Sequence, residues 1–498
     1  MTRKGTQSIA FRFLAVAFLL METAILAVKA KAKPFWWDEM LTYYISIQGS
    51  LSRVLEALDT GIDATPPAYY VLLHVSKILP IADPHIQLRV VSILGYLLTL
   101  TGVYLFSSRR WNPWAASAAV LFLALTPFRD YAVEARPYAA VVGFFAMAAA
   151  CWQRIGESRW AAPGFAVFLT AGVAMHHLAV AVLGCFGLAE LAWSVVRRKI
   201  RWQTCGGMAL AVIPFVAALP ALFRFKSLYQ GGAIVPPGWG VMFSTYSAYT
   251  GLSLHLILGA ITACVLVIGM GAWAWTRSGR GANQWVVPES LLILSFLAFP
   301  ALLVAMVRLS GGVYTPRYGW SVIIGVGLVV ALLAGALRTK AVLCLVAGLA
   351  FGCMLQALLD WKGRNDEWKE LYAMLGQLEQ WRQRKPELPL VQADGFQQML
   401  IHRYGEEPLK RATVQLMDMP LLIKYQGSPG VDMSNWLLRK YIPLPMAQRK
   451  DFLAAHNRFL LCSTRNTRNW LERYLRHEGY RMEMLDDGSW GILFLVER

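Results

Sequence analysis

The sequence predicts a polytopic α-helical membrane protein that ends in a soluble α/β domain. Hydrophobic residues make up 56% of the chain and charged residues only 16%, and the mean hydropathy is +0.44. An ordinary soluble domain of average composition is less apolar. The apolar residues gather in runs of about 15 to 24, close to the roughly 20 that a helix needs to cross the hydrocarbon core. After Asp360 charged residues become frequent.

About 11 apolar runs are candidates for membrane-spanning helices. The run from Phe11 to Val28 is too long for a signal peptide and lacks a small-residue cleavage site, so we expect a retained helix. Only His176 and His177 separate the fifth run from the sixth. The runs cover residues 11–28, 86–106, 114–129, 138–152, 164–180, 178–196, 204–222, 252–275, 288–307, 319–337 and 341–359.

The basic residues predict the orientation of the chain. The net charge is +18, and Lys and Arg concentrate in short loops that all fall on one side of the membrane in this count of helices. Because such loops are cytoplasmic, we expect a cytoplasmic N-terminus and no nucleic-acid partner. The exceptions are Lys29, Lys31 and Lys33. They either bind an anionic lipid headgroup or diphosphate, or form a solvated flank of the first helix.

Two domains are expected. Residues 1–359 form the membrane domain, whose first outer loop, about residues 34–85, holds SLSRVLEALD and PPAYYVLLHVSKIL. Amphipathic spacing in the first stretch and the prolines that begin the second predict helices lying along the membrane surface. Residues 360–498 form an extracytoplasmic α/β domain of about 139 residues, in which short apolar runs (LPLVQAD, ATVQLM, RFLLCST, GILFLVER) alternate with helical patterns (EWKELYAMLGQLEQW, NTRNWLERYLRHEG).

The sequence indicates neither a nucleotide-binding loop nor a cysteine framework. The C-terminal domain has no Gly-rich phosphate loop. Six of the seven cysteines lie in or beside apolar runs at irregular spacing, and Cys462 stands alone in the polar tail. We therefore expect no disulfide scaffold and no CxxC metal site.

The stretch FWWDEMLTYY at residues 35–44 places two adjacent carboxylates, Asp38 and Glu39, directly after the first predicted helix. Charged groups are costly to desolvate at a membrane boundary, so these two residues are candidates for chemistry. Beside aromatic rings the pKa of a carboxyl group can rise toward the range that suits proton abstraction. The structural alternative is that Asp38 caps a helix and Glu39 is solvated.

Two further motifs combine arginine with tyrosine at predicted outer membrane edges. In YAVEARPY, Glu134 and Arg136 precede Tyr138, and this pair either orders the loop by an internal ion pair or binds the hydroxyls and phosphate of a ligand. In YTPRY, Arg317 precedes Tyr318 at the entry to a helix. A guanidinium there can make paired bonds to phosphate oxygens or contact lipid headgroups.

The remaining polar candidates are one arginine and three histidines. Arg89 lies near the outer end of the second predicted helix, where a cation needs a partner such as Asp38 or an anionic lipid-linked substrate. His74, His176 and His177 show no HxxxH or HExxH spacing on one helix, so a divalent metal is not indicated. We expect no other cofactor.

These motifs resemble those of bacterial integral-membrane glycosyltransferases of the GT-C superfamily. The resemblance is carried by the DE pair, the PPxYY helix, LRxxS at Leu88 to Ser92, EARPY, a His-containing boundary and the PRY element. It covers about residues 8–340, in the branch related to protein O-mannosyltransferases and the lipid A aminoarabinose transferase. Thr65 stands where a His often precedes the prolines, and the His176–His177 pair replaces a more usual His-Tyr, which affects the expected acceptor contacts.

The resemblance implies an inverting hexosyl- or pentosyltransferase of the bacterial inner membrane that takes a polyprenyl-phosphate sugar donor from the outer leaflet. The active site and the C-terminal domain are expected on the periplasmic or extracellular face. Asp38 is the expected base, with support from Glu39, and the acceptor is lipid A, another glycan, a glycolipid or a protein. Substrate contacts are expected from Tyr69, His74, Arg89, Glu134, Arg136, Tyr138, Arg317 and Tyr318.

The chemistry agrees with this resemblance, and three alternative functions compete with it. A polyprenyl phosphate is a good leaving group, so the reaction needs a base and cations that offset charge on the phosphate. A transporter or flippase of lipid-linked sugars is the main alternative, although the sequence shows no convincing internal repeat. A polymerase or ligase of the O-antigen type is expected to carry its catalytic groups in one large late loop. A receptor role leaves the DE and EARPY motifs unexplained.

Overall fold

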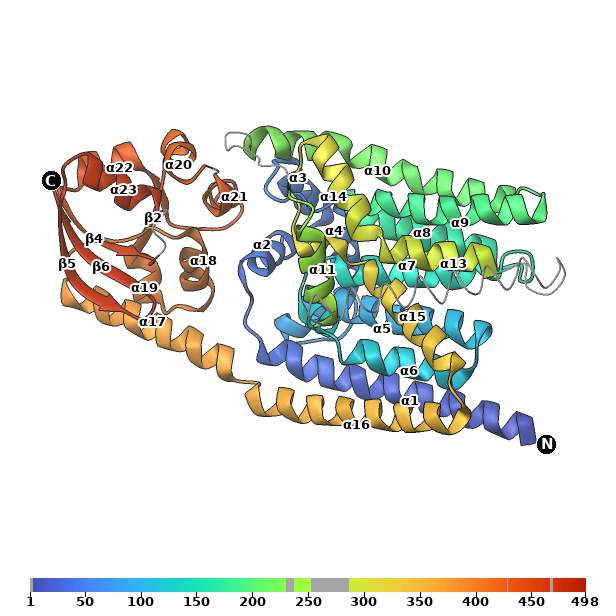
Figure 1. Ribbon diagram of the computed structural model, residues 1–498. Coiled ribbons are helices and arrows are strands. Elements are labelled where there is room, and N and C mark those ends of the chain that lie inside the picture. The colour runs from blue at the N-terminus through green and yellow to red at the C-terminus, as the bar shows by residue number, and fades with distance from the viewer. Residues whose placement is uncertain (1–2, 230–236, 252–285, 428, 466–468) are drawn as a thin grey trace. The chain divides into compact units, whose positions relative to one another are not determined.

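The chain folds into two compact units, which are described separately. The computed structural model describes residues 3–229, 237–251, 286–427, 429–465 and 469–498. The first unit, called here the membrane unit, consists of Met1–Lys31, Thr65–Leu219 and Ile234–Gly363. The second, called the C-terminal unit, consists of Ala32–Ala64, Pro220–Ala233 and Arg364–Arg498. Figure 1 shows the strands of the C-terminal unit in orange and red.

In the described residues, the membrane unit is entirely helical. It holds three short 3-10 helices, η1 (Pro127–Val133), η2 (His177–Ala181) and η3 (Pro316–Gly319). Its α-helices are α1 (Arg3–Ala32), α4 (Pro67–Ser76), α5 (Pro84–Arg110), α6 (Pro113–Ala124), α7 (Tyr138–Trp152), α8 (Ala161–Met175), α9 (Val182–Arg197), α10 (Trp202–Tyr229, assigned to this unit up to Leu219), α11 (Val241–Thr250), α13 (Val286–Leu297), α14 (Phe299–Ser310), α15 (Val322–Ala336) and α16 (Thr339–Gly363).

Four helices of the described residues are long and apolar enough to cross a membrane, or six if two bent pairs each form one span. The bent pairs are α6 with η1, at 69°, and α13 with α14, at 57°. The helices part at the two histidines, because α8 ends at Met175 and η2 begins at His177, whereas the predicted runs 164–180 and 178–196 place this boundary a few residues later. The run predicted at 252–275 lies outside the described residues, and the total of about 11 spanning helices stays a prediction.

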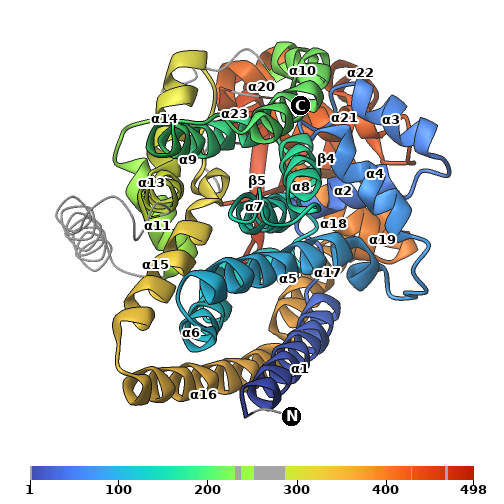
Figure 2. The same ribbon diagram turned by 90° about the vertical axis from the view of Figure 1, so that its right-hand side faces the viewer.

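Glycines bring α5 and α7 into close contact. A Cβ atom added at Gly95 would lie 2.4 Å from the backbone of Ala140, and one added at Gly143 would lie 2.2 Å from the carbonyl oxygen of Gly95. Small residues allow membrane helices to approach to backbone contact. In both views α5 lies between α7 and α1 (Figures 1 and 2). The close packing fixes the start of α7, which carries the last residue of the EARPY motif.

The C-terminal unit combines helices with one six-stranded sheet. Its strands are β1 (Leu390–Gln392), β2 (Thr413–Met417), β3 (Met446–Gln448), β4 (Arg458–Ser463), β5 (Arg481–Gly488) and β6 (Gly491–Glu497). Its helices are α2 (Trp37–Ser46), α3 (Leu51–Asp59), α17 (Asp366–Arg384), α18 (Gly395–Tyr404), α19 (Glu407–Ala412), α20 (Met419–Gln426), α21 (Gly430–Leu438), α22 (Arg449–Ala455) and α23 (Trp470–His477).

The sheet has the order β3-β2-β1-β4-β6-β5. The first four strands are parallel, with Val391 of β1 paired to Val414 of β2 and Leu461 of β4. Strand β6 runs antiparallel to both β4 and β5. Buried parallel strands read as short continuous apolar runs, and all four predicted runs form strands here. The sequence did not reveal β3, which has only three residues, or β5, a polar edge strand.

Candidate active site

The adjacent carboxylates Asp38 and Glu39 lie in the first turn of α2, in the C-terminal unit. Asp38 is 4% exposed and Glu39 is fully buried. The Glu39 carboxylate accepts a hydrogen bond from the backbone N–H of Trp36 at 3.4 Å, and the helix dipole favours anions in this turn. The alternative with a capping Asp38 and a solvated Glu39 is therefore wrong, because Glu39 is buried and caps the helix.

The LRxxS and EARPY motifs are neighbours in the membrane unit. The Ser92 hydroxyl of α5 donates to the backbone carbonyl of Arg136 at 3.0 Å. The backbone N–H of Arg136 donates in turn to the carbonyl of Glu134 at 2.8 Å, which closes a tight turn. Arg136 is buried and Glu134 is half-buried. The turn before α7 is thus held by its own backbone and by α5.

Arg89 lies one turn before Ser92 on α5 and is fully buried. Its guanidinium donates to the backbone carbonyl of Ala30, in the last turn of α1. Carbonyls at the C-terminal end of a helix carry negative partial charge and favour cations. The end of α1 therefore supplies a partner that the sequence did not suggest, and a role of Arg89 in donor binding stays a prediction.

Four aromatic rings and one guanidinium come together in the membrane unit. The ring centroid of His176 lies 4.6 Å from that of Trp320 and 5.2 Å from that of Tyr318. The Tyr138 centroid lies 5.8 Å from Trp320 and 5.9 Å from His176. The guanidinium carbon of Arg317 is 5.8 Å from the Tyr138 centroid, within cation–π range. These five residues are called the aromatic cluster, and they unite the EARPY and PRY motifs.

The aromatic cluster adds Trp320, which the sequence did not single out, to His176 of the His-containing boundary. Trp320 is fully buried and follows the PRY element by two positions. His176 accepts a hydrogen bond at Nδ1 from the backbone N–H of Leu178 at 3.2 Å, so it caps η2. Across the described parts of the chain, no group of three His, Cys, Asp or Glu side chains is placed to hold a metal ion.

Tyr69 and His74 lie on α4 of the membrane unit. Tyr69 is fully buried, and its ring packs edge-on against Tyr70 with the centroids 5.9 Å apart. His74 lies half-buried in the last turn of the helix. The predicted proline-started helix is confirmed, while the substrate contacts expected from these two residues stay predictions.

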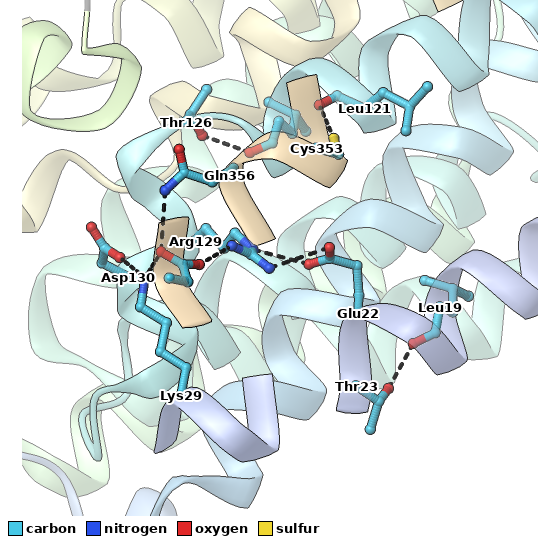
Figure 3. Close-up of polar contacts among 12 residues, drawn as sticks. Leu19, Glu22, Thr23, Lys29, Leu121, Thr126, Arg129, Asp130, Cys353 and Gln356 are labelled. Atoms are coloured by element: carbon cyan, nitrogen blue, oxygen red, sulfur yellow. Dashed lines mark hydrogen bonds and ion pairs between the residues drawn. The ribbon is translucent and has the colours of Figure 1, made fainter. Parts of the chain in front are cut away.

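The membrane unit also holds a charged network that none of the predicted motifs includes (Figure 3). Arg129 of η1 donates through Nε to Glu22 of α1 at 3.1 Å and through a terminal nitrogen to Asp360 of α16 at 2.5 Å. Lys29 of α1 lies 2.8 Å from Asp130 and 3.4 Å from Asp360. Glu22 and Arg129 are 1% and 4% exposed. We call these five residues the ion network, which joins α1, η1 and α16.

The ion network corrects the expectations for Lys29. It was predicted either to bind a headgroup or diphosphate or to be solvated, but it pairs with two carboxylates of its own unit. The sequence did carry a signal for the network. Glu22 interrupts the first apolar run, Arg129 ends the third, and Asp360 follows the last. An ionisable residue in such a place requires a partner, and opposite charges in different runs could have been matched.

The C-terminal unit contains a cavity of about 540 Å³ at the carboxyl ends of β2 and β3. Its walls include Met417, Met433 and Trp436 and the ion pair of Asp418 with Arg449, whose Nε and Oδ2 atoms are 2.8 Å apart. Carboxyl ends of parallel strands are a frequent place for ligands in α/β folds. No sequence motif indicates this cavity.

Comparison with known proteins reveals the fold but no sequence relative. The crystal structure of ArnT from Cupriavidus metallidurans bound to undecaprenyl phosphate superimposes with a TM-score of 0.58 at 13% sequence identity, covering 98% of each chain. The apo structure of the same protein gives a TM-score of 0.57 at 12% identity, again covering 98% of each chain. The chain has the GT-C fold. The resemblance predicted from the GT-C motifs is thus confirmed at the level of the fold.

A third GT-C structure, the Archaeoglobus fulgidus oligosaccharyltransferase tethered to an acceptor peptide, gives a TM-score of 0.46 at 10% identity. It covers 95% of this chain and 74% of its own. No family model matches the sequence, and no curated protein matches it.

Proposed function

We propose that the protein is an inverting glycosyltransferase that moves a sugar from a polyprenyl-phosphate donor to an extracytoplasmic hydroxyl or phosphate. The acceptor is lipid A, another glycan, a glycolipid or a protein. The aromatic cluster is the observation that carries this proposal. It places the arginine of the PRY motif beside the tyrosine of EARPY, in a fold shared with an ArnT structure that holds undecaprenyl phosphate.

The chemistry of the aromatic cluster fits a phosphate attached to a sugar and a lipid. The planar guanidinium of Arg317 can make two parallel bonds to phosphate oxygens. The faces of Tyr138 and Tyr318 lie 5.8 Å and 5.9 Å from the same guanidinium carbon and hold it in place. Arg136, anchored through its carbonyl by Ser92, is the second predicted phosphate contact.

The proposed reaction is a single displacement at the anomeric carbon. The acceptor oxygen attacks this carbon, its bond to the phosphate oxygen breaks, and polyprenyl phosphate leaves with the electron pair. Asp38 takes the proton of the acceptor hydroxyl, and Glu39 holds the start of α2 through its bond to the Trp36 N–H. Attack from the face opposite the leaving group inverts the anomeric centre. The arginines offset the charge that develops on the phosphate.

The proposal includes an extracytoplasmic active site in the bacterial inner membrane, based on the distribution of basic loops. Gly49 offers a site for a cysteine label, because a Cβ added there meets nothing within 4 Å. Arg159, exposed between α7 and α8, offers a site predicted to be cytoplasmic. In intact cells an impermeant thiol reagent should label Gly49→Cys and spare Arg159→Cys. The reverse pattern would invalidate the orientation.

The function itself is tested with purified protein in lipid nanodiscs. A panel of polyprenyl-phosphate sugars is supplied together with an envelope extract as the source of acceptors. Release of polyprenyl phosphate that depends on the extract supports the glycosyltransferase. If the protein moves a labelled donor between leaflets of a vesicle and releases no polyprenyl phosphate, the protein is a flippase and the proposed transferase activity is wrong.

A further inference from the structure

The helix that carries Asp38 is held by the C-terminal domain, residues 364–498 of the same compact unit. The Tyr44 hydroxyl of α2 lies 2.7 Å from Nδ1 of His402 in α18, although the two residues are 358 positions apart. Their rings meet edge to face with the centroids 5.3 Å apart. Tyr44 is 4% exposed. The contact is therefore a buried one between the first outer loop and the C-terminal domain.

The protonation of His402 fits an acceptor role at Nδ1. A neutral imidazole carries one ring proton, and with that proton on Nε2 the Nδ1 atom accepts from the Tyr44 hydroxyl. Burial, and after it the positive charge of Lys410, lowers the pKa of His402. The ring is therefore neutral at pH 7.

Further contacts fix both ends of the same loop segment. Before α2, the backbone N–H of Phe35 donates to the Tyr404 hydroxyl at 2.9 Å, and Phe35 is 1% exposed. After α3, the carbonyl of Ile62 accepts from the Ser434 hydroxyl of α21 at 3.1 Å. Residues from two helices of the C-terminal domain thus hold residues 35–62 at both ends.

The supporting helix α18 is itself well anchored. It follows β1, a central strand of the sheet, and Asp394 between them accepts from the backbone N–H groups of Phe396 and Gln397 at 2.7 Å and 3.2 Å. Such an N-cap stabilises the start of a helix. His402 and Tyr404 lie in the last turn of α18, at the end opposite the Asp394 cap. Their side chains therefore project from a helix that is anchored at its start.

We propose that the C-terminal domain acts as a positioning module, in which Tyr44 and His402 fix the orientation of α2 and thereby the carboxylate of Asp38. This inference rests on the proposed function, in which Asp38 is the base. A general base must lie within hydrogen-bond reach of the proton it takes, and a displacement of about 1 Å can cost 100-fold in rate. The domain thus acts on the reaction without touching the substrate.

The test uses the full chain in nanodiscs and two pairs of variants. His402→Leu removes the acceptor, whereas His402→Asn keeps a polar atom close to the position of Nδ1 and should rescue the contact. Tyr44→Phe removes the donor from the other side, in case His402→Leu folds poorly. Tyr474→Phe is the matched control, since it deletes a hydroxyl that accepts from Arg449 at 2.6 Å in the same domain.

Two readouts separate this inference from the proposed function. Hydrogen exchange of the α2 amides reports whether the domain holds the helix, with or without a donor. Tyr44→Phe and His402→Leu should speed this exchange and lower kcat by about 10- to 100-fold, with unchanged donor affinity. His402→Asn and Tyr474→Phe should stay close to the parent protein.

The inference is overturned if His402→Leu and Tyr44→Phe leave either the α2 exchange or kcat unchanged, or if Tyr474→Phe has the same effects. The proposed function fails separately. If Asp38→Asn keeps normal turnover, Asp38 is not the base, while the exchange measurement still decides whether the domain holds α2.

Discussion

The two units deal with buried charge in different ways. In the membrane unit, Arg129 lies between the carboxylates of Glu22 and Asp360, so positive and negative groups compensate each other. In the C-terminal unit the buried carboxyl group of Asp432 accepts a hydrogen bond from the side-chain amide of Gln415. Burial, together with the negative charge of Asp394, raises the pKa of Asp432 to about 7. In the membrane unit a counter-ion neutralises the buried charge, and in the C-terminal unit a bound proton neutralises the carboxyl group.

This difference has a physical cause and a structural consequence. A buried ion without a partner is costly, and a group that can exchange protons with water escapes the cost by becoming neutral. An ion pair instead needs a second residue, which fixes the helices that carry the two groups. The ion network therefore joins α1 and α16 to η1, the segment that precedes the EARPY turn. A protonated Asp432 needs only hydrogen-bond partners close to it.

The largest effect is expected from Arg129→Gln, which removes the cation between Glu22 and Asp360 and leaves Lys29 beside Asp360. Removal of one partner from a buried ion pair typically costs about 3–5 kcal/mol. The melting temperature of the detergent-solubilised protein should fall accordingly. Adding Glu22→Gln to this variant should recover part of the loss, because the orphaned carboxylate is gone.

Arg201→Gln is the matched control for the ion network. Arg201 donates through Nε to Glu190 at 3.0 Å and also donates to the carbonyl of Trp152, the last residue of α7. This pair is therefore at the opposite end of α7 from Tyr138. Both arginine variants should lose stability, but only Arg129→Gln should weaken donor binding. Equal stability of Arg129→Gln and the parent protein would show that the ion network does not hold the three helices together.

Asp432 sharpens the contrast through the pH dependence of stability. Its pKa is about 7 in the folded protein and 3.8 without the fold, so between these values the folded state binds more protons than the unfolded state. Stability should therefore fall as the pH rises from about 4 to 7, by at most about 1.4 kcal/mol per pH unit from this group, and level off above 7.

Asp432→Asn removes this titration. The variant should lose that part of the decline and be more stable than the parent protein at pH 8, as measured by hydrogen exchange in β2 and α21 at a series of pH values. A parent protein whose stability in this domain rises between pH 4 and 7 in comparison with Asp432→Asn would mean that Asp432 is ionised through a partner, as in the membrane unit.

A smaller effect is expected at Arg317, a cation that lies beside the rings of Tyr138 and Tyr318. Arg317→Lys keeps the charge but loses the planar fork, so donor affinity should weaken about tenfold, equivalent to about 1.4 kcal/mol. Arg317→Ala should weaken it further. Binding of a polyprenyl-phosphate sugar in nanodiscs measures both. If both variants bind as tightly as the parent protein, Arg317 is an anchor for lipid headgroups.

The sequence predicted elements that depend on local pattern. The four apolar runs of the C-terminal domain became β1, β2, β4 and β6, and the two histidines that interrupt the fifth and sixth apolar runs lie between α8 and α9. The GT-C resemblance also gave the right fold. These features follow from hydrophobic periodicity and from motifs, both of which are visible within a short window.

Features that depend on distant pairing could not be read in the same way. Nothing near Tyr44 indicates that it meets His402, and nothing near Lys29 indicates Asp130 and Asp360. Arg89 was expected to pair with an anion, and its guanidinium donates a hydrogen bond to a backbone carbonyl at the end of α1. Such partners are determined by packing between segments, which a single sequence does not reveal.

The most direct test of the central claim is the rate of polyprenyl-phosphate release by Asp38→Asn. The substitution keeps size and much of the hydrogen bonding, but the amide cannot accept the proton of the acceptor. Turnover should fall about 100-fold or more with donor affinity unchanged, since a positioned general base typically contributes about 10² to 10⁴ in rate, and Glu39→Gln should lose less. Near-normal release by Asp38→Asn, with or without a loss in Glu39→Gln, would contradict the account.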